Sequence, residues 1–62
     1  MTYRNLKAAI ERANTEYQSG QMTAEEYRAF REQKERMMGV FLRTNRLTQE
    51  QYDELEGMFI EV

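Results

Sequence analysis

Acidic side chains come nearest to a catalytic or metal-binding pattern in this 62-residue chain. Glu25 and Glu26 are adjacent, and Glu50, Asp53 and Glu54 cluster near the carboxyl end. Adjacent residues on a helix do not share a face, so the first two cannot act as a carboxylate pair. The later cluster lacks the central glycine and distal glutamate of a calcium-binding loop. Both groups therefore predict solvated helix surface.

The residue types that perform most enzyme chemistry are absent. The sequence contains no histidine, cysteine or tryptophan. That removes the commonest general base, the thiol nucleophile and the soft metal ligands. The three glycines are scattered singly, so no glycine-rich phosphate-binding loop is present. We therefore expect no enzyme: no catalytic residue, no cofactor, no metal and no evident small-molecule substrate.

The length allows a single domain over residues 1–62. A chain of this size buries only about 60% of the surface that its unfolded form exposes. Without cysteines for disulfides or zinc, its stability must come from helix packing or oligomerisation. No apolar run approaches the ~20 residues of a membrane span, and the first residues lack the apolar segment of a signal peptide. We expect a cytoplasmic protein with no membrane association.

Apolar spacing and the scattered glycines predict helices at about 3–18, 24–43 and 49–60, with turns near 19–22 and 44–47. In the first segment, apolar residues recur at intervals of three and four and so share one helical face. These residues are Tyr3, Leu6, Ile10, Ala13 and Tyr17. The predicted fold class is all-α: a small three-helix bundle with a longer central helix, assembling through helix–helix contacts.

Two stretches, residues 20–27 and 45–52, carry the same signals for a turn and a helix start. Thr23 and Thr48 are expected N-caps, and the Glu or Gln three residues after each completes a capping box. The first residue of each stretch is Gly or Asn, the types most tolerant of positive φ at a helix end. Good helix starts converge on this pattern, so it predicts two similar turns and no repeat protein.

Charge is unevenly distributed along the chain, although the net charge is only −2. Residues 28–46 carry six Lys or Arg and two Glu, whereas residues 47–62 carry five acidic residues and no basic one. In a helix-turn-helix arrangement the last helix would enter DNA, where its carboxylates would meet phosphates. The pattern argues against nucleic-acid binding, with a small DNA-binding transcriptional regulator as an alternative.

The central segment has more apolar side chains than one helical face can hold. Consecutive residues point in different directions around a helix, so part of the run 37–42 is expected outside a monomer's core. Exposed apolar surface of this kind marks an interface, although burial within a monomer explains the same run. The predicted interface residues are Met37, Met38, Val40, Phe41, Leu42, Met58 and Ile60. A second, acidic partner surface is predicted at Glu50, Asp53, Glu54 and Glu56.

The stretch from Gly20 to Tyr27 resembles the short C-terminal domain (SHOCT) at the ends of many bacterial proteins. The matching residues are Gly20, Met22, Thr23, Glu25, Glu26 and Tyr27. The family's terminal leucine pair would fall near Lys34 and Glu35, and this chain adds a third helix, so it departs from the family pattern there. The resemblance implies a helical oligomerisation or interaction module in a bacterial or phage setting.

The sequence therefore predicts a small non-enzymatic helical module of bacterial or phage type that works by protein–protein contact. Its expected partner is another protein or a second copy in a homo-oligomer. The alternative within the same class of small proteins is a phage or mobile-element inhibitor that binds a host protein. That alternative is motivated by the acidic final segment, which suits a basic surface.

Overall fold

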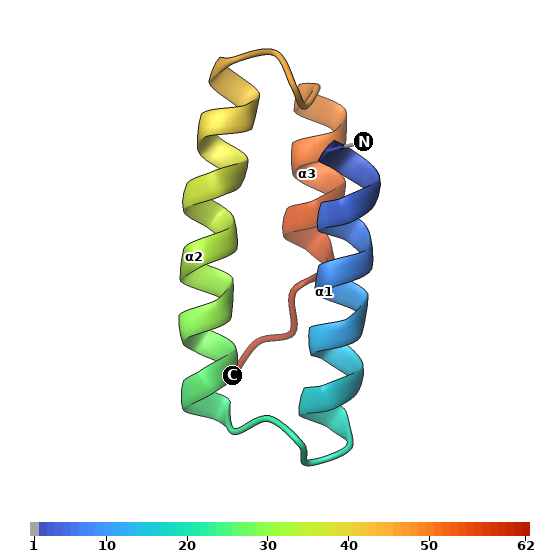
Figure 1. Ribbon diagram of the computed structural model, residues 1–62, viewed down its shortest axis with the longest axis vertical. Coiled ribbons are helices and arrows are strands. Elements are labelled where there is room, and N and C mark those ends of the chain that lie inside the picture. The colour runs from blue at the N-terminus through green and yellow to red at the C-terminus, as the bar shows by residue number, and fades with distance from the viewer. Residues whose placement is uncertain (1) are drawn as a thin grey trace.

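The computed structural model describes residues 2–62, which form three helices and no strand. Helix α1 spans Thr2–Gln18, α2 spans Ala24–Arg43 and α3 spans Gln49–Met58. Helices α1 and α3 run in one direction and α2 runs in the other, as Figure 1 shows. The bundle measures 35 × 17 × 16 Å along its principal axes. The predicted all-α three-helix bundle with a longer central helix is confirmed.

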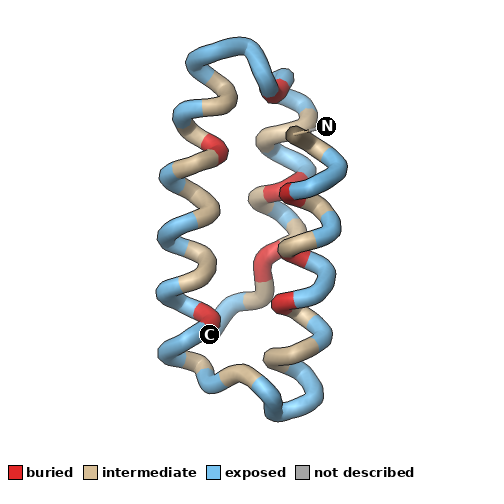
Figure 2. Tube along the Cα trace, in the orientation of Figure 1, coloured by how far each residue is buried: buried red, intermediate tan, exposed pale blue. Residues whose placement is uncertain are grey.

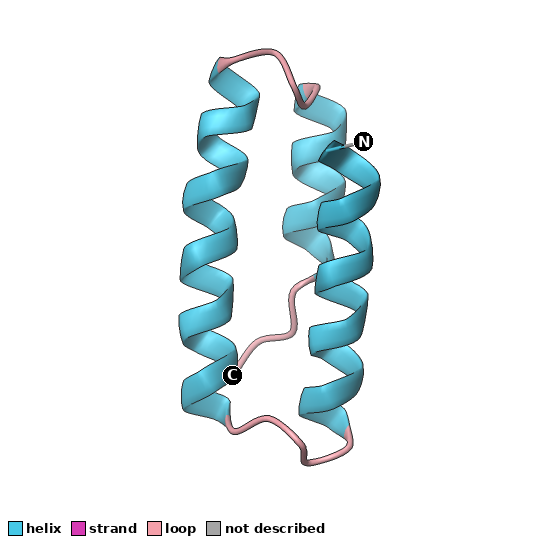
Figure 3. Cartoon of the chain, viewed as in Figure 1, coloured by secondary structure: helices cyan, strands magenta, loops and turns pink. Residues whose placement is uncertain are grey.

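The two turns share one backbone geometry, and they appear as the loops at opposite ends of the bundle in Figure 3. Gly20 has φ 84° and Asn45 has φ 62°, so each occupies the left-handed region. The residue after each donates its N–H to the carbonyl oxygen five positions earlier, at 2.8 Å in both turns. This bond satisfies a carbonyl that the ending helix leaves without a partner. The predicted similarity of the two turns is confirmed.

Both predicted capping boxes are present. The Thr23 hydroxyl accepts from the Glu26 N–H at 3.1 Å, and the Glu26 carboxylate accepts from the Thr23 N–H at 2.9 Å. Thr48 and Gln51 make the equivalent pair, with both bonds at 3.0 Å. A cap of this kind stabilises a helix by about 1 kcal/mol. The starts of α2 and α3 are therefore determined locally.

The core lies where the three helices face one another, as the buried segments in Figure 2 show. Its members are Leu6, Ile10, Ala13, Tyr27, Met38, Leu47, Leu55 and Phe59. In α2 the fully buried residues are Tyr27 and Met38, while Met37 and Phe41 are only half-buried. Tyr27 and Met38 share a face because eleven residues span three turns of helix. Of the two adjacent methionines, Met38 is therefore the core residue, so its predicted place on an exposed interface is corrected.

Helix α3 ends at Met58, two residues before the predicted boundary. Phe59 is extended, with φ −68° and ψ 139°, and its side chain enters the core. Residues 59–62, here called the tail, then pass toward the first half of α2 (Figure 1). The Tyr27 hydroxyl accepts from the Ile60 N–H at 2.9 Å, and Asn14 Nδ2 donates to the Met58 carbonyl at 2.9 Å. These side chains bind backbone groups at the helix end, which favours the extended tail over another helical turn.

Candidate functional site

Two adjoining hollows lie along α1, and the first of them lies between α1 and α2; no residue of α3 lines either. One hollow of about 190 Å³ is lined by Thr2, Asn5, Leu6, Lys34, Met37 and Phe41. A second hollow of about 230 Å³ shares Asn5 and continues along α1, lined also by Ala8, Ala9 and Arg12. We call the surface formed by these nine residues the α1–α2 groove. Helix α2 lines only the first hollow, and the second lies on α1 alone.

The α1–α2 groove combines an apolar floor with a basic margin. Met37 and Phe41 supply half-buried apolar surface beside the buried Leu6. The Lys34 ammonium lies 5.6 Å from the centre of the Phe30 ring, so the lysine stem covers apolar surface while its charge stays near water. None of the described residues that line the groove carries a carboxylate. The groove is therefore apolar and positively charged.

The seven predicted interface residues do not form one surface. Met37 and Phe41 line the α1–α2 groove, whereas Met38 is in the core. Val40 is 45% exposed and lines neither hollow of the groove. Leu42, Met58 and Ile60 are half-buried, and the last two pack against the core beneath the end of α3. Two of the seven residues thus define an accessible apolar site.

The predicted acidic surface on α3 is also divided. Glu50 and Asp53 are exposed, and Asp53 accepts a hydrogen bond from the Gln49 side chain at 2.9 Å. Glu54 turns toward α1, where its Oε2 accepts from the Tyr3 hydroxyl and lies 3.4 Å from Lys7 Nζ. The Tyr3 hydrogen bond, followed by the Lys7 charge, lowers the pKa of Glu54. Glu54 therefore links α3 to α1 through its contacts with Tyr3 and Lys7.

Glu56 lies on the other flank of α3, in a cluster that bridges to α2. Arg31 Nη2 is 3.8 Å from Glu56 Oε1, and Arg31 Nε is 3.2 Å from Glu35 Oε2. Burial and then the neighbouring Glu35 carboxylate raise the pKa of Glu56, while Arg31 opposes that shift. Within residues 2–62, the buried Oε2 of Glu56 has no hydrogen-bond partner. One guanidinium thus serves two carboxylates, and Glu56 is unsuited to an open partner surface.

A buried hydrogen-bond network holds the tail in place, and it was not predicted from the sequence. Tyr27 is fully buried, and its hydroxyl donates to Asn14 Oδ1 while accepting from the Ile60 N–H. Asn14 in turn donates to the Met58 carbonyl, so α1, α2 and the end of α3 meet in one network. The available signal was the position of Asn14, four residues after Ile10 and so beside the core face of α1. A polar residue there needs a partner.

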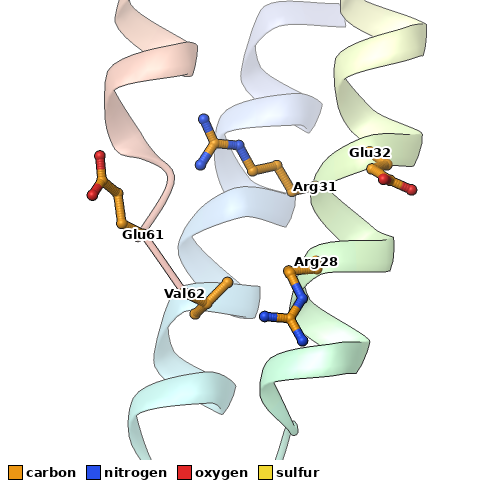
Figure 4. A pocket seen from close by; sticks show the side chains of 5 residues that line it. All are labelled: Arg28, Arg31, Glu32, Glu61 and Val62. Atoms are coloured by element: carbon orange, nitrogen blue, oxygen red, sulfur yellow. The ribbon is translucent and has the colours of Figure 1, made fainter.

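Another hollow, of about 360 Å³, lies between the first half of α2 and the tail (Figure 4). Its lining residues are Arg28, Arg31, Glu32, Glu61 and Val62. In Figure 4 the side chains of Glu32 and Glu61 point outward from opposite sides of the hollow, and Arg31 is already paired with Glu35. Arg28 and Arg31 both extend from α2 toward the tail, whereas the two carboxylates point away from the hollow.

Comparison with known proteins gave no match among protein-family models, curated proteins or solved structures. The SHOCT-like resemblance of residues 20–27 therefore stays a prediction. Among residues 2–62, no helix has both the length and the apolar character needed to cross a bilayer.

Proposed function

We propose that this chain is a small non-enzymatic helical module that works by binding another protein. The supporting observation is the α1–α2 groove, where Met37 and Phe41 remain half-buried along an elongated depression. Elongated apolar grooves between helices are a recurring site for amphipathic helices. The SHOCT-like stretch supports a bacterial or phage setting.

The composition of the groove agrees with an interaction role. Protein interfaces combine an apolar centre with a polar, solvent-accessible rim. In the α1–α2 groove, Met37 and Phe41 provide the centre, and Asn5, Arg12 and Lys34 provide the rim. Methionine also adapts its shape to a partner, which suits a binding surface. A partner that fills the groove would complete the burial that the monomer leaves unfinished on this side.

Site-specific photo-crosslinking in bacterial cells tests this function. A photoreactive amino acid replaces Met37 in the groove, and in a matched variant it replaces Ala29, which is exposed elsewhere on α2. We expect a discrete crosslinked protein from position 37 and none from position 29. Equal crosslinking from both positions, or none from position 37, would remove the support for an interaction module built on this groove.

A further inference from the structure

We propose that the α1–α2 groove binds an amphipathic helix of another protein, and that acidic residues flank the apolar stripe of that helix. This inference rests on the proposed interaction function and names the chemistry of the partner. It follows from the length of the groove, the size of the residues along it, and the sign of the charges at its margin.

The groove has the dimensions of a helix-binding site. Along α1 its lining extends from Thr2 to Arg12, which is roughly 15 Å at ~1.5 Å per residue. A helix of about ten residues covers the same distance. Ala8 and Ala9 keep the α1 side of the groove low, so a partner backbone can approach closely, at the ~8–10 Å axis separation of packed helices. Met37 and Phe41 offer a floor for its apolar stripe at the Thr2 end, where α2 lines the first hollow.

A helix bound in this groove would complete a four-helix bundle. Helix α3 packs against both α1 and α2, and it lines no part of the α1–α2 groove. In Figure 1, α3 lies behind α1, and the tail crosses from the end of α3 toward α2. The partner helix would occupy the remaining side of the pair. Four helices around a shared apolar centre are a common arrangement of such bundles.

The positive charges at the groove favour a partner whose contacting residues are negatively charged. Lys34 and Arg12 line it, and the Arg46 guanidinium lies 5.9 Å from the centre of the Phe41 ring. No described lining residue is acidic, so these cations are not neutralised within the groove. Lys34 is half-buried against Phe30, where its field is screened less than in open water. Carboxylates beside the partner's apolar stripe would pair with these groups.

The same charges argue against a second copy of this chain as the occupant. A dimer formed through one shared face is two-fold symmetric, so each groove faces the other. Lys34 and Arg12 of one copy would then meet the basic groove of its neighbour, and like charges across an interface disfavour association. Helix α3 of a second copy fits no better, because its apolar Leu55 is fully buried and its outward Glu50 and Asp53 supply charge without an apolar stripe.

Titration of the intact protein with two designed peptides tests the inference. Both peptides are helices of about 15 residues with the same leucine stripe, and they differ only in flanking residues, Glu in one and Lys in the other. Backbone amide shifts are followed by NMR. We expect the acidic peptide to bind roughly tenfold more tightly and to shift Asn5, Ala9 and Met37.

Charge reversal in the protein provides the matched comparison. Lys34→Glu and Arg12→Glu should each weaken the acidic peptide severalfold, and together they should favour the basic one. Arg36→Glu makes the same charge change at an exposed position outside the groove and should leave the preference intact. Thermal unfolding of each variant confirms that it is folded; Arg12 is exposed, so its variant keeps the test valid if Lys34→Glu unfolds.

Three results would overturn the inference. The first is equal affinity for the two peptides, and the second is a set of shifts confined to α3 or the tail. The third is a concentration-dependent shift of Met37 in the protein alone, which would identify a second copy as the occupant. Crosslinking from Met37 that persists while the peptides show no charge preference would leave the interaction function standing and reject only the acidic helix.

Discussion

Removal of one hydroxyl group, by Tyr27→Phe, should release the tail and destabilise the whole bundle. The substitution keeps the ring in the core, where it contacts Tyr17 and Phe30 at centroid distances of 5.1 and 6.1 Å. It deletes the group that donates to Asn14 and accepts from the Ile60 N–H. The perturbation therefore separates the polar network from the packing around it.

The expected cost follows from the two hydrogen bonds lost. Each contributes about 0.5–1.5 kcal/mol net, and a partner left without a bond in a buried site adds to the loss. We therefore expect a decrease of about 1–3 kcal/mol in the free energy of unfolding. A domain of this size has a total stability of only about 3–9 kcal/mol at the usual value per residue. In a domain this small, each kcal/mol lowers Tm by roughly 4–8 °C.

Urea denaturation followed by circular dichroism measures the global effect, and hydrogen exchange of the Ile60 amide measures release of the tail. Tyr52→Phe is the matched control, because Tyr52 is half-buried and its hydroxyl makes no hydrogen bond within residues 2–62. The control should change stability by less than about 0.5 kcal/mol. If Tyr27→Phe behaves like Tyr52→Phe and Ile60 keeps its protection, the network does not hold the tail and our account of the end of α3 is wrong.

The remaining predictions concern glycines and carboxylates. A Cβ at Gly39 or Gly57 would meet nothing within 4 Å, so alanine at either position should raise the free energy of unfolding by about 0.5–1 kcal/mol and with it the urea midpoint. Gly20→Ala should lower the urea midpoint because φ at Gly20 is 84°. A lower midpoint for both helical glycine variants would contradict this account. The pKa of Glu56 is raised in the fold, so its protonated form stabilises the protein at low pH and that contribution is lost as pH rises. Glu56→Gln should therefore raise Tm at pH 7.5, with a gain that shrinks toward pH 4. The pKa of Glu54 is lowered, so its stabilisation is present near neutrality and lost as pH falls. Glu54→Gln should therefore lower Tm at pH 7.5 and have little effect at pH 3, and a pH-independent difference for either variant would reject the assigned cause.

The elements predictable from the sequence are those with local causes. The turn at Gly20 and the cap at Thr23 depend on residues that lie within one helical turn of each other, and the same is true of Asn45 and Thr48. The helix starts and the order of the helices could therefore be predicted from the sequence alone.

The features that sequence reasoning missed depend on residues far apart in the chain. The end of α3 is fixed by Tyr27 and Asn14, which bind backbone groups 33 and 44 residues away. Which of two adjacent methionines enters the core depends on where α1 and α3 lie, and the sequence placed both Met37 and Met38 at the predicted interface. The pairing of Glu56 with Arg31 likewise follows from the docking of α3. In each case the cause is tertiary packing.

The two matching turns also bear on how quickly the chain folds. Each left-handed residue and capping box stops one helix and starts the next from signals within a few residues, so the path of the chain is set before distant parts meet. Helical bundles dominated by local contacts fold in about microseconds to milliseconds. The contacts with the greatest separation, such as Tyr3 with Glu54 and Asn14 with Met58, require closure of almost the whole chain. We therefore expect α1 and α2 to pair early, and the docking of α3 and its tail to complete folding.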